Sequence, residues 1–188
     1  MALRNAEIMD KLKFNPSHIH NSKEWYRLFS YGLIHNDFMH LAVNMYVLWN
    51  FGEIVIDDFQ ELFGPLANLY FVLLYIPALA ISVVPSYFKN KENIFYNAVG
   101  ASGAVSAVVY TSIILNPSLP MRLIFIPIDL QAWIFGALFL AYTIYMDKKG
   151  NTRIGHSAHL WGALYGMLFI FVIEPRIYLW LLYQILGG

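Results

Sequence analysis

The chain has 188 residues, of which 59% are hydrophobic and 13% are charged. Soluble domains carry about 25% charged residues, so this composition indicates a membrane protein built as one helical bundle. The formal net charge of +0 gives no indication of a nucleic-acid partner. Because the sequence contains no cysteine, a disulfide, a metal–thiolate site and a cysteine nucleophile are excluded. Any nucleophile must therefore be a hydroxyl group.

Five stretches approach the roughly 20 apolar residues that a helix needs to cross the hydrocarbon core of a bilayer. In chain order they cover residues 38–56, 66–84, 101–115, 130–146 and 158–173. Charged or proline-containing loops separate them, and the fourth follows a proline-broken lead-in over residues 120–127. The sequence therefore predicts an all-α polytopic membrane fold with five visible spans.

The two ends of the chain differ from this pattern. Residues 1–24 are polar and lack an apolar run long enough for a span or a signal peptide, so we expect a separate segment there. Pro175, between Glu174 and Arg176, stops the last span, which gives a membrane domain over residues 25–176. Residues 177–188 then form an apolar tail at the membrane interface, unless the last helix kinks at Pro175 and continues.

The third span opens with Gly100-Ala101-Ser102-Gly103. At a helix start, the helix dipole and the unpaired N–H groups of the first turn both favour an anion beside Ser102. The two glycines allow a substrate or another backbone to approach closely. Taken alone the tetrapeptide is a weak signal, since the serine can equally be an N-cap or a small packing residue.

The fifth span carries His159 at its head, where an ionisable residue is costly and indicates function. Gly162 and Gly166 share its helix face and would let the third span pack closely enough for Ser102 to reach the imidazole, which pairs a nucleophile with a base. His156 lies further out, lacks the glycine face and is the second candidate for the base. The alternative is an interfacial histidine on a helix that packs through Gly-x-x-x-Gly.

His40 and Asn44 are four residues apart near the start of the first span and share one helix face. Because successive spans alternate in direction, this start lies on the same membrane face as Ser102 and His159. Both side chains donate hydrogen bonds that suit an oxyanion, although they could instead join two helices. A metal site is a minor possibility, because the sequence has no His-x-x-x-His and no carboxylate lies four residues from His40.

Together these elements resemble the rhomboid family of intramembrane serine proteases. The resemblance extends over residues 25–173 and rests on motifs in the family's order: Trp25-Tyr26-Arg27-Leu28, His35, His40, Asn44, Gly-x-Ser-Gly and Ala-His-x-x-Gly. It implies a Ser102–His159 dyad without a carboxylate and without a metal or organic cofactor. It also implies an oxyanion hole made by His40, Asn44 and the Ser102 N–H group, with His35 near its mouth.

Two features depart from the family pattern. Tyr26 stands before Arg27 where the family usually has tryptophan. The family core has six spans, and its first span, which precedes this motif, is not visible in this sequence. Either the sequence is an amino-terminally shortened form, or the protein manages with five spans. The positions of the lysines and arginines also matter. Under the family topology nearly all of them lie on the catalytic face of the membrane, and only Arg122 and Arg176 lie on the opposite face. This distribution is the reverse of the positive-inside expectation. The resemblance still implies a multi-pass protein of a bacterial plasma membrane, with its active site towards the extracytoplasmic side.

The activity that the resemblance implies is hydrolysis of peptide bonds in or near the transmembrane segment of single-span proteins. Such substrates would reach the site from the lipid bilayer and unwind locally, because the backbone groups of a transmembrane helix are already paired. A catalytically silent relative that binds or delivers membrane clients would have lost Ser102 or His159. A transporter or channel would carry charged residues deep inside its spans, which are nearly free of them. The sequence leaves the oligomeric state open.

Overall fold

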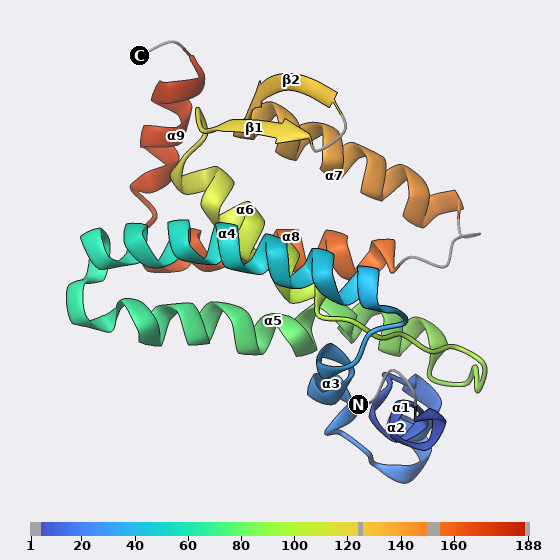
Figure 1. Cartoon of the computed structure of the whole chain (residues 1–188). Coiled ribbons are helices and arrows are strands. Elements are labelled where there is room, and N and C mark those ends of the chain that lie inside the picture. The colour runs from blue at the N-terminus through green and yellow to red at the C-terminus, as the bar shows by residue number, and fades with distance from the viewer. Residues whose placement is uncertain (1–4, 124–125, 150–154, 187–188) are drawn as a thin grey trace.

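The computed structural model describes residues 5–123, 126–149 and 155–186. Each of the five predicted spans is a helix (Figure 1), and their bounds are α4 Phe38–Phe63, α5 Ala67–Asn90, α6 Ser102–Leu115, α7 Ala132–Lys149 and α8 His156–Ile173. The apolar stretch Phe38–Asn90, which contains α4 and α5, and the helix α8 are long and apolar enough to cross a membrane. The predicted all-α membrane fold is confirmed.

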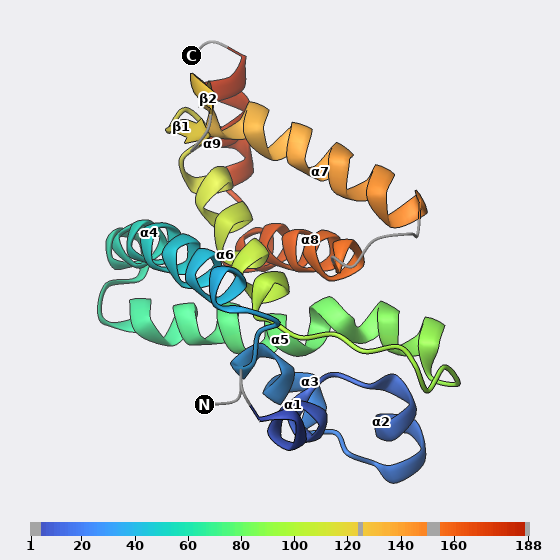
Figure 2. The same ribbon diagram turned by 45° about the vertical axis from the view of Figure 1, so that its right-hand side comes forward.

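Helix α6 forms the centre of the bundle. All but two of its residues are buried, and it packs against α4, α5 and α8 (Figure 2). Helices α4 and α5 run antiparallel and are joined by the short 3-10 helix η3 Gly64–Leu66. Helix α7 packs against α8 on the outer side of the bundle. The central position of α6 brings its first residue, Ser102, beside three other helices.

Two glycines of α8 allow the close contact between α6 and α8. A Cβ atom added at Gly162 would overlap the carbonyl oxygen of Gly103, and one added at Gly166 would overlap that of Ala107. Since both obstacles are backbone atoms, neither can rotate aside. The predicted glycine face is therefore confirmed as the contact that joins these two helices.

Replacing Gly162 with alanine is expected to lower the apparent melting temperature of the protein in detergent micelles. Overpacking of this kind costs about 1–3 kcal/mol, because α6 and α8 must separate to accept the methyl group. Gly52→Ala on α4 is the matched control, since a Cβ there would meet only the Phe71 ring at an ordinary 3.5 Å. Equal melting temperatures for the two variants would contradict the assigned contact.

A proline inside α5 is tolerated because another helix supplies the missing donor. Pro77 cannot donate a hydrogen bond to the carbonyl oxygen of Leu73, which would normally leave that oxygen unpaired inside the membrane. The hydroxyl group of Tyr165 on α8 donates to it at 2.8 Å. The same bond ties the first third of α5 to the middle of α8.

The stretch before α7 contains a β-hairpin that the sequence analysis did not predict. Strands β1 Pro120–Leu123 and β2 Ile126–Gln131 pair antiparallel, with Pro120 opposite Gln131. The lead-in was expected to be irregular because of its prolines. In a two-stranded sheet, however, every strand has a free edge, and proline is tolerated there, while the isoleucine-rich sequence between the prolines favours strands.

The part of the chain before α4 is helical and packs against α5 and the loop before α6. Its elements are α1 Ala6–Leu12, α2 Pro16–Ser22, α3 Arg27–Ser30 and η2 Tyr31–Leu33. Phe14 and Ile19 are fully buried in the main hydrophobic cluster. Phe14 also forms two backbone hydrogen bonds with Ala98, of 2.9 and 3.0 Å, in the loop before α6. The division at residue 24 stays a prediction, and these contacts tie the segment to the membrane domain.

Arg27 organises this segment through backbone contacts. Its buried guanidinium group donates hydrogen bonds to the carbonyl oxygens of Asp10, at 2.7 Å, and Lys13, at 2.9 Å, and it pairs with the carboxylate of Glu24. These bonds satisfy three acceptors with one fixed, planar group. Tyr26, the departure from the family motif, keeps its ring half exposed beside this group.

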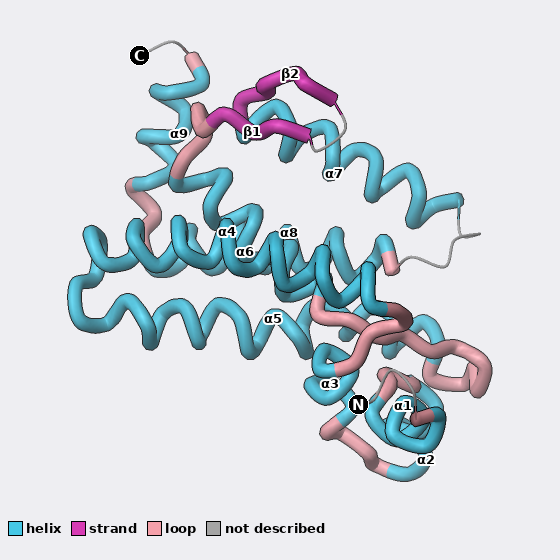
Figure 3. The backbone as a smooth tube through the Cα atoms, in the orientation of Figure 1, coloured by secondary structure: helices cyan, strands magenta, loops and turns pink. Residues whose placement is uncertain are grey.

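The chain leaves the last span at Glu174 and forms a separate helix, α9 Ile177–Ile185. A short loop separates α8 from α9 (Figure 3), and α9 turns sharply away from the direction of α8. The break at Pro175 is therefore a helix end and not a kink. Large apolar side chains of α9 remain exposed, among them Leu179, Leu182 and Tyr183.

Candidate active site

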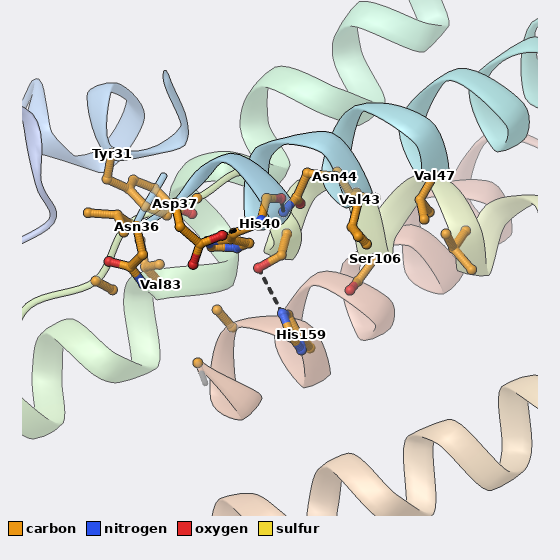
Figure 4. Close-up of a pocket in the computed structure, with 18 of the residues that line it drawn as sticks. Tyr31, Asn36, Asp37, His40, Val43, Asn44, Val47, Val83, Ser106 and His159 are labelled. Carbon is orange, nitrogen blue, oxygen red and sulfur yellow. Dashed lines mark hydrogen bonds between the residues drawn. The ribbon is translucent and has the colours of Figure 1, made fainter. Parts of the chain in front are cut away.

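The starts of α6 and α8 bring Ser102 and His159 together. The Oγ atom of Ser102 and the Nε2 atom of His159 are 2.7 Å apart, a hydrogen-bond distance (Figure 4). Ser102 is the first residue of α6, and His159 lies in the first turn of α8. The glycine contact between the two helices holds these first turns together, so the arrangement follows from the packing of the spans.

A cavity of about 1120 Å³ opens at this pair. The four predicted site residues all line it, namely Ser102, His159, His40 and Asn44. Its end at the start of the helices is polar, with Lys13, Asn36, Asp37 and Asn97. Further along α4, α6 and α7 the lining is apolar and includes Val47, Phe51, Val109, Phe135 and Phe139. The cavity therefore leads from polar groups into the membrane-embedded part of the bundle.

Helix α4 presents His40 and Asn44 to the cavity from one face. Asp37 caps this helix by accepting a 2.7 Å hydrogen bond from the backbone N–H group of His40. The side-chain amide of Asn44 donates one hydrogen bond, of 2.8 Å, to the carbonyl oxygen of His40. An asparagine amide carries two N–H groups, so one of them is used within the helix and the other is left for the cavity.

Gly100 makes room for the His40 ring in the loop before α6. Its φ angle is +105°, which residues with a side chain rarely adopt. A Cβ atom at this position would lie 2.6 Å from Cε1 of His40 and 2.9 Å from its Nε2 atom. Gly100 is therefore needed both for the loop conformation and for the placement of His40. The sequence analysis predicted only that this glycine allows a close approach of a substrate or another backbone.

The first turn of α6 supplies unpaired backbone donors beside Ser102. The first N–H groups of a helix have no partner within it, and Ala101, the residue before α6, has no side chain that could accept from them. Together with the helix dipole, these donors favour negative charge at this end of the cavity. The arrangement suits an oxygen that becomes negatively charged during a reaction at Ser102.

The other two histidines of interest lie behind this site. His35 is buried and packs edge-on against His40, with ring centroids 4.9 Å apart. Burial, and then the nearby His40 ring, lower the pKa of His35, which favours its neutral form. His40 itself lines the cavity. His156 is also buried and contacts Tyr142 and His159. The hydroxyl group of Ser102 is paired with His159 and not with His156. No group of three metal-ligating side chains occurs in the described ranges.

Known proteins resemble this chain over most of its length. The family model of the Rhomboid domain matches residues 22–176. The presenilin-associated rhomboid-like protein, mitochondrial, of Mus musculus is 32% identical over 142 residues, which cover 72% of this chain and 35% of the relative. RHOMBOID-like protein 12, mitochondrial, of Arabidopsis thaliana is 30% identical over 140 residues, or 69% of this chain and 40% of the relative.

A third relative, Rhomboid protein 1, mitochondrial, of Saccharomyces cerevisiae, is 28% identical over 148 residues, which cover 76% of this chain and 40% of the relative. The chain thus spans between 35% and 40% of the length of these curated relatives. The names of these relatives describe mitochondrial proteins, so they do not support the expected location in a bacterial plasma membrane. The matched domain, the helical bundle and the apolar spans agree, and the chain is a membrane protein that belongs to the rhomboid family.

Proposed function

We propose that this protein is an intramembrane serine endopeptidase. It hydrolyses peptide bonds in or near the transmembrane segment of single-span membrane proteins. The observation that carries the proposal is the 2.7 Å distance between Ser102 Oγ and His159 Nε2 at the polar end of a cavity between membrane helices. The two residues whose loss would mark a silent relative are both present and in contact.

The proposed reaction begins with a proton transfer from Ser102 to His159. The neutral imidazole accepts the hydroxyl proton at Nε2 while Oγ attacks the carbonyl carbon of the scissile bond. The imidazolium ion then protonates the leaving amine, which breaks the carbon–nitrogen bond and leaves an ester on Ser102. Water enters from the polar end of the cavity, loses a proton to His159 and attacks the ester carbon. The bond from that carbon to Ser102 Oγ then breaks, His159 returns the proton to Oγ, and the product leaves with a free carboxyl group.

Negative charge on the carbonyl oxygen needs donors that are already in place. We assign this role to His40, Asn44 and the backbone N–H group of Ser102, which border the same end of the cavity. Fixed donors of this kind stabilise the transition state because they need no reorganisation as charge develops. The carbonyl oxygen would have to lie within about 3 Å of them.

The apolar lining favours a substrate segment that comes from a membrane. Val47, Phe51 and Val109 offer contacts to apolar side chains beyond the scissile bond. A transmembrane helix has all its backbone groups paired, so the segment has to unwind locally before Ser102 can attack it. The polar side chains at the cavity mouth, such as Asn36 and Asn97, can bind the backbone groups that unwinding exposes.

Labelling with a fluorophosphonate tests the proposal directly. The full chain in liposomes, incubated with this serine-directed probe, is expected to carry the adduct on the tryptic peptide that contains Ser102. Pre-treatment with the probe should also block cleavage of a model single-span substrate in the same liposomes. Heat-denatured protein is the control and should stay unlabelled, because the reaction depends on His159 as a base. A folded chain that neither cleaves nor reacts at Ser102 would refute the proposal.

A further inference from the structure

The His159 ring needs something that fixes its orientation. In a Ser-His-Asp triad a carboxylate holds the second ring nitrogen and keeps the imidazole directed at the serine. In the part of the chain that the structure describes, the hydroxyl group of Ser102 is the only hydrogen-bond partner of the His159 ring. The torsion that turns such a ring is broad and weakly restrained by itself. Packing must therefore do what the carboxylate does elsewhere.

Helix α7 supplies an aromatic face at this place. The ring of Phe139 stacks on His159, with centroids 6.4 Å apart and planes 30° from each other. One turn further along α7, Tyr142 meets the ring of His156 edge-on at 5.7 Å. His156 in turn contacts His159 edge-on at 6.1 Å. We call these four rings the α7–α8 ring cluster, which consists of Phe139, Tyr142, His156 and His159.

The cluster restrains His159 from two directions. Phe139 covers one face of the imidazole, and the ring of His156 meets it nearly perpendicular, at 81°. Aromatic pairs attract one another at centroid separations of about 4.5–7 Å, so both contacts lie in the favourable range. A rotation that tilted the ring plane, and Nε2 with it, away from Ser102 would break the stacked contact, whereas the hydrogen bond to Ser102 selects between the two orientations of the ring within that plane. Stacking uses neither ring nitrogen, so it leaves Nε2 free for the proton transfer.

We propose that Phe139 is a positioning residue for the general base, holding the His159 ring in the orientation that directs Nε2 at Ser102. This inference rests on the proposed peptidase function. It requires an aromatic ring at position 139 and not merely an apolar side chain that fills the space. Because Phe139 belongs to α7, this contact makes the geometry of the Ser102–His159 pair depend on the position of α7 relative to α8.

Phe135 provides a matched control on the same helix. It lies one turn before Phe139, lines the same cavity and is half-buried like Phe139. The two rings stack on each other at 6.0 Å, but the ring contact with His159 belongs to Phe139. Phe→Leu at either position removes the same atoms from the cavity wall, so a difference between the variants reports the contact with the base.

The test compares steady-state cleavage of a model single-span substrate by four full-length proteins in liposomes: wild type, Phe139→Leu, Phe139→Tyr and Phe135→Leu. Phe139→Leu is expected to lower kcat roughly tenfold, the factor that corresponds to one lost aromatic pair. Its KM should stay within about twofold, since the substrate is bound before the base acts. Phe139→Tyr should restore kcat, and any effect of Phe135→Leu, which lines the cavity without touching the base, should fall on KM and not on kcat.

Three results would each overturn the positioning role. They are a wild-type kcat in Phe139→Leu, a loss of kcat in Phe135→Leu as large as that in Phe139→Leu, and a kcat of Phe139→Tyr no higher than that of Phe139→Leu. Rates are expressed per folded molecule, with the helical circular dichroism signal as the measure of folding. Phe139→Met, which keeps the side-chain length, repeats the test if leucine lowers stability. A wild-type protein that neither cleaves nor reacts with fluorophosphonate would refute the peptidase itself, whereas an active wild type with an unaffected Phe139→Leu variant would refute only this inference.

Discussion

Replacing Ser102 with alanine is expected to abolish cleavage of a single-span substrate while the protein still folds. Loss of the nucleophile in serine hydrolases lowers kcat by roughly 10⁶-fold, and among the residues that the structure describes no second hydroxyl group is paired with His159. The substitution removes one oxygen from a half-buried residue and leaves the packing of α6 unchanged. The measurement is the rate of product formation in liposomes, with the melting temperature of each protein recorded beside it.

Ser106→Ala is the control for this prediction. Ser106 lies one turn further along α6 and lines the same cavity, so its replacement makes the same chemical change a short distance away. We expect this variant to keep turnover within a few-fold of wild type. If Ser102→Ala cleaved the substrate at a rate close to that of Ser106→Ala, Ser102 would be ruled out as the nucleophile.

Replacing His159 with alanine is expected to inactivate the protein as completely as loss of Ser102. A nucleophile and its base act as a unit, so losing either one costs about as much as losing both. The double variant should therefore be no slower than either single variant. The comparison uses cleavage rates measured with enzyme in excess over substrate, because very slow cleavage can then still be detected.

The neighbouring His156 serves as the control in this series. His156→Ala is expected to retain activity, because His156 packs against Tyr142 and the edge of His159 and has no contact with the Ser102 hydroxyl group. An active His159→Ala together with an inactive His156→Ala would mean that the base has been assigned to the wrong histidine, even if Ser102 remains the nucleophile.

The parts of the site that could be predicted from sequence are those that depend on helix periodicity and direction. Gly162 and Gly166 recur at helical spacing after His159, and this local pattern was enough to predict close packing with α6. The alternating direction of spans was enough to predict that the starts of α4 and α6 lie on the same membrane face, and His40 and Ser102 there line one cavity. Both arguments need only that apolar helices cross a membrane and return.

Other features depend on contacts between distant segments and could not be predicted. The pairing of Phe14 with Ala98 joins two loops, neither of which has a periodic pattern. The stacking of Phe139 on His159 depends on the rotation of α7, and every face of this helix is apolar in sequence. The hairpin before α7 was missed because proline was read only as a helix breaker, although a two-stranded sheet also accepts it.

The separation of Ser102 and His159 along the chain has a consequence for biosynthesis. The two residues are 57 positions apart, and ribosomes add roughly 5–20 residues per second, so the proposed nucleophile is made about 3–11 s before its proposed base. Helix α8 is the last of the five spans to be made, and its glycine face must dock on α6 before the pair exists. If the proposed activity is correct, the nascent chain stays inactive towards other proteins at the insertion site until α8 has been made and has docked on α6.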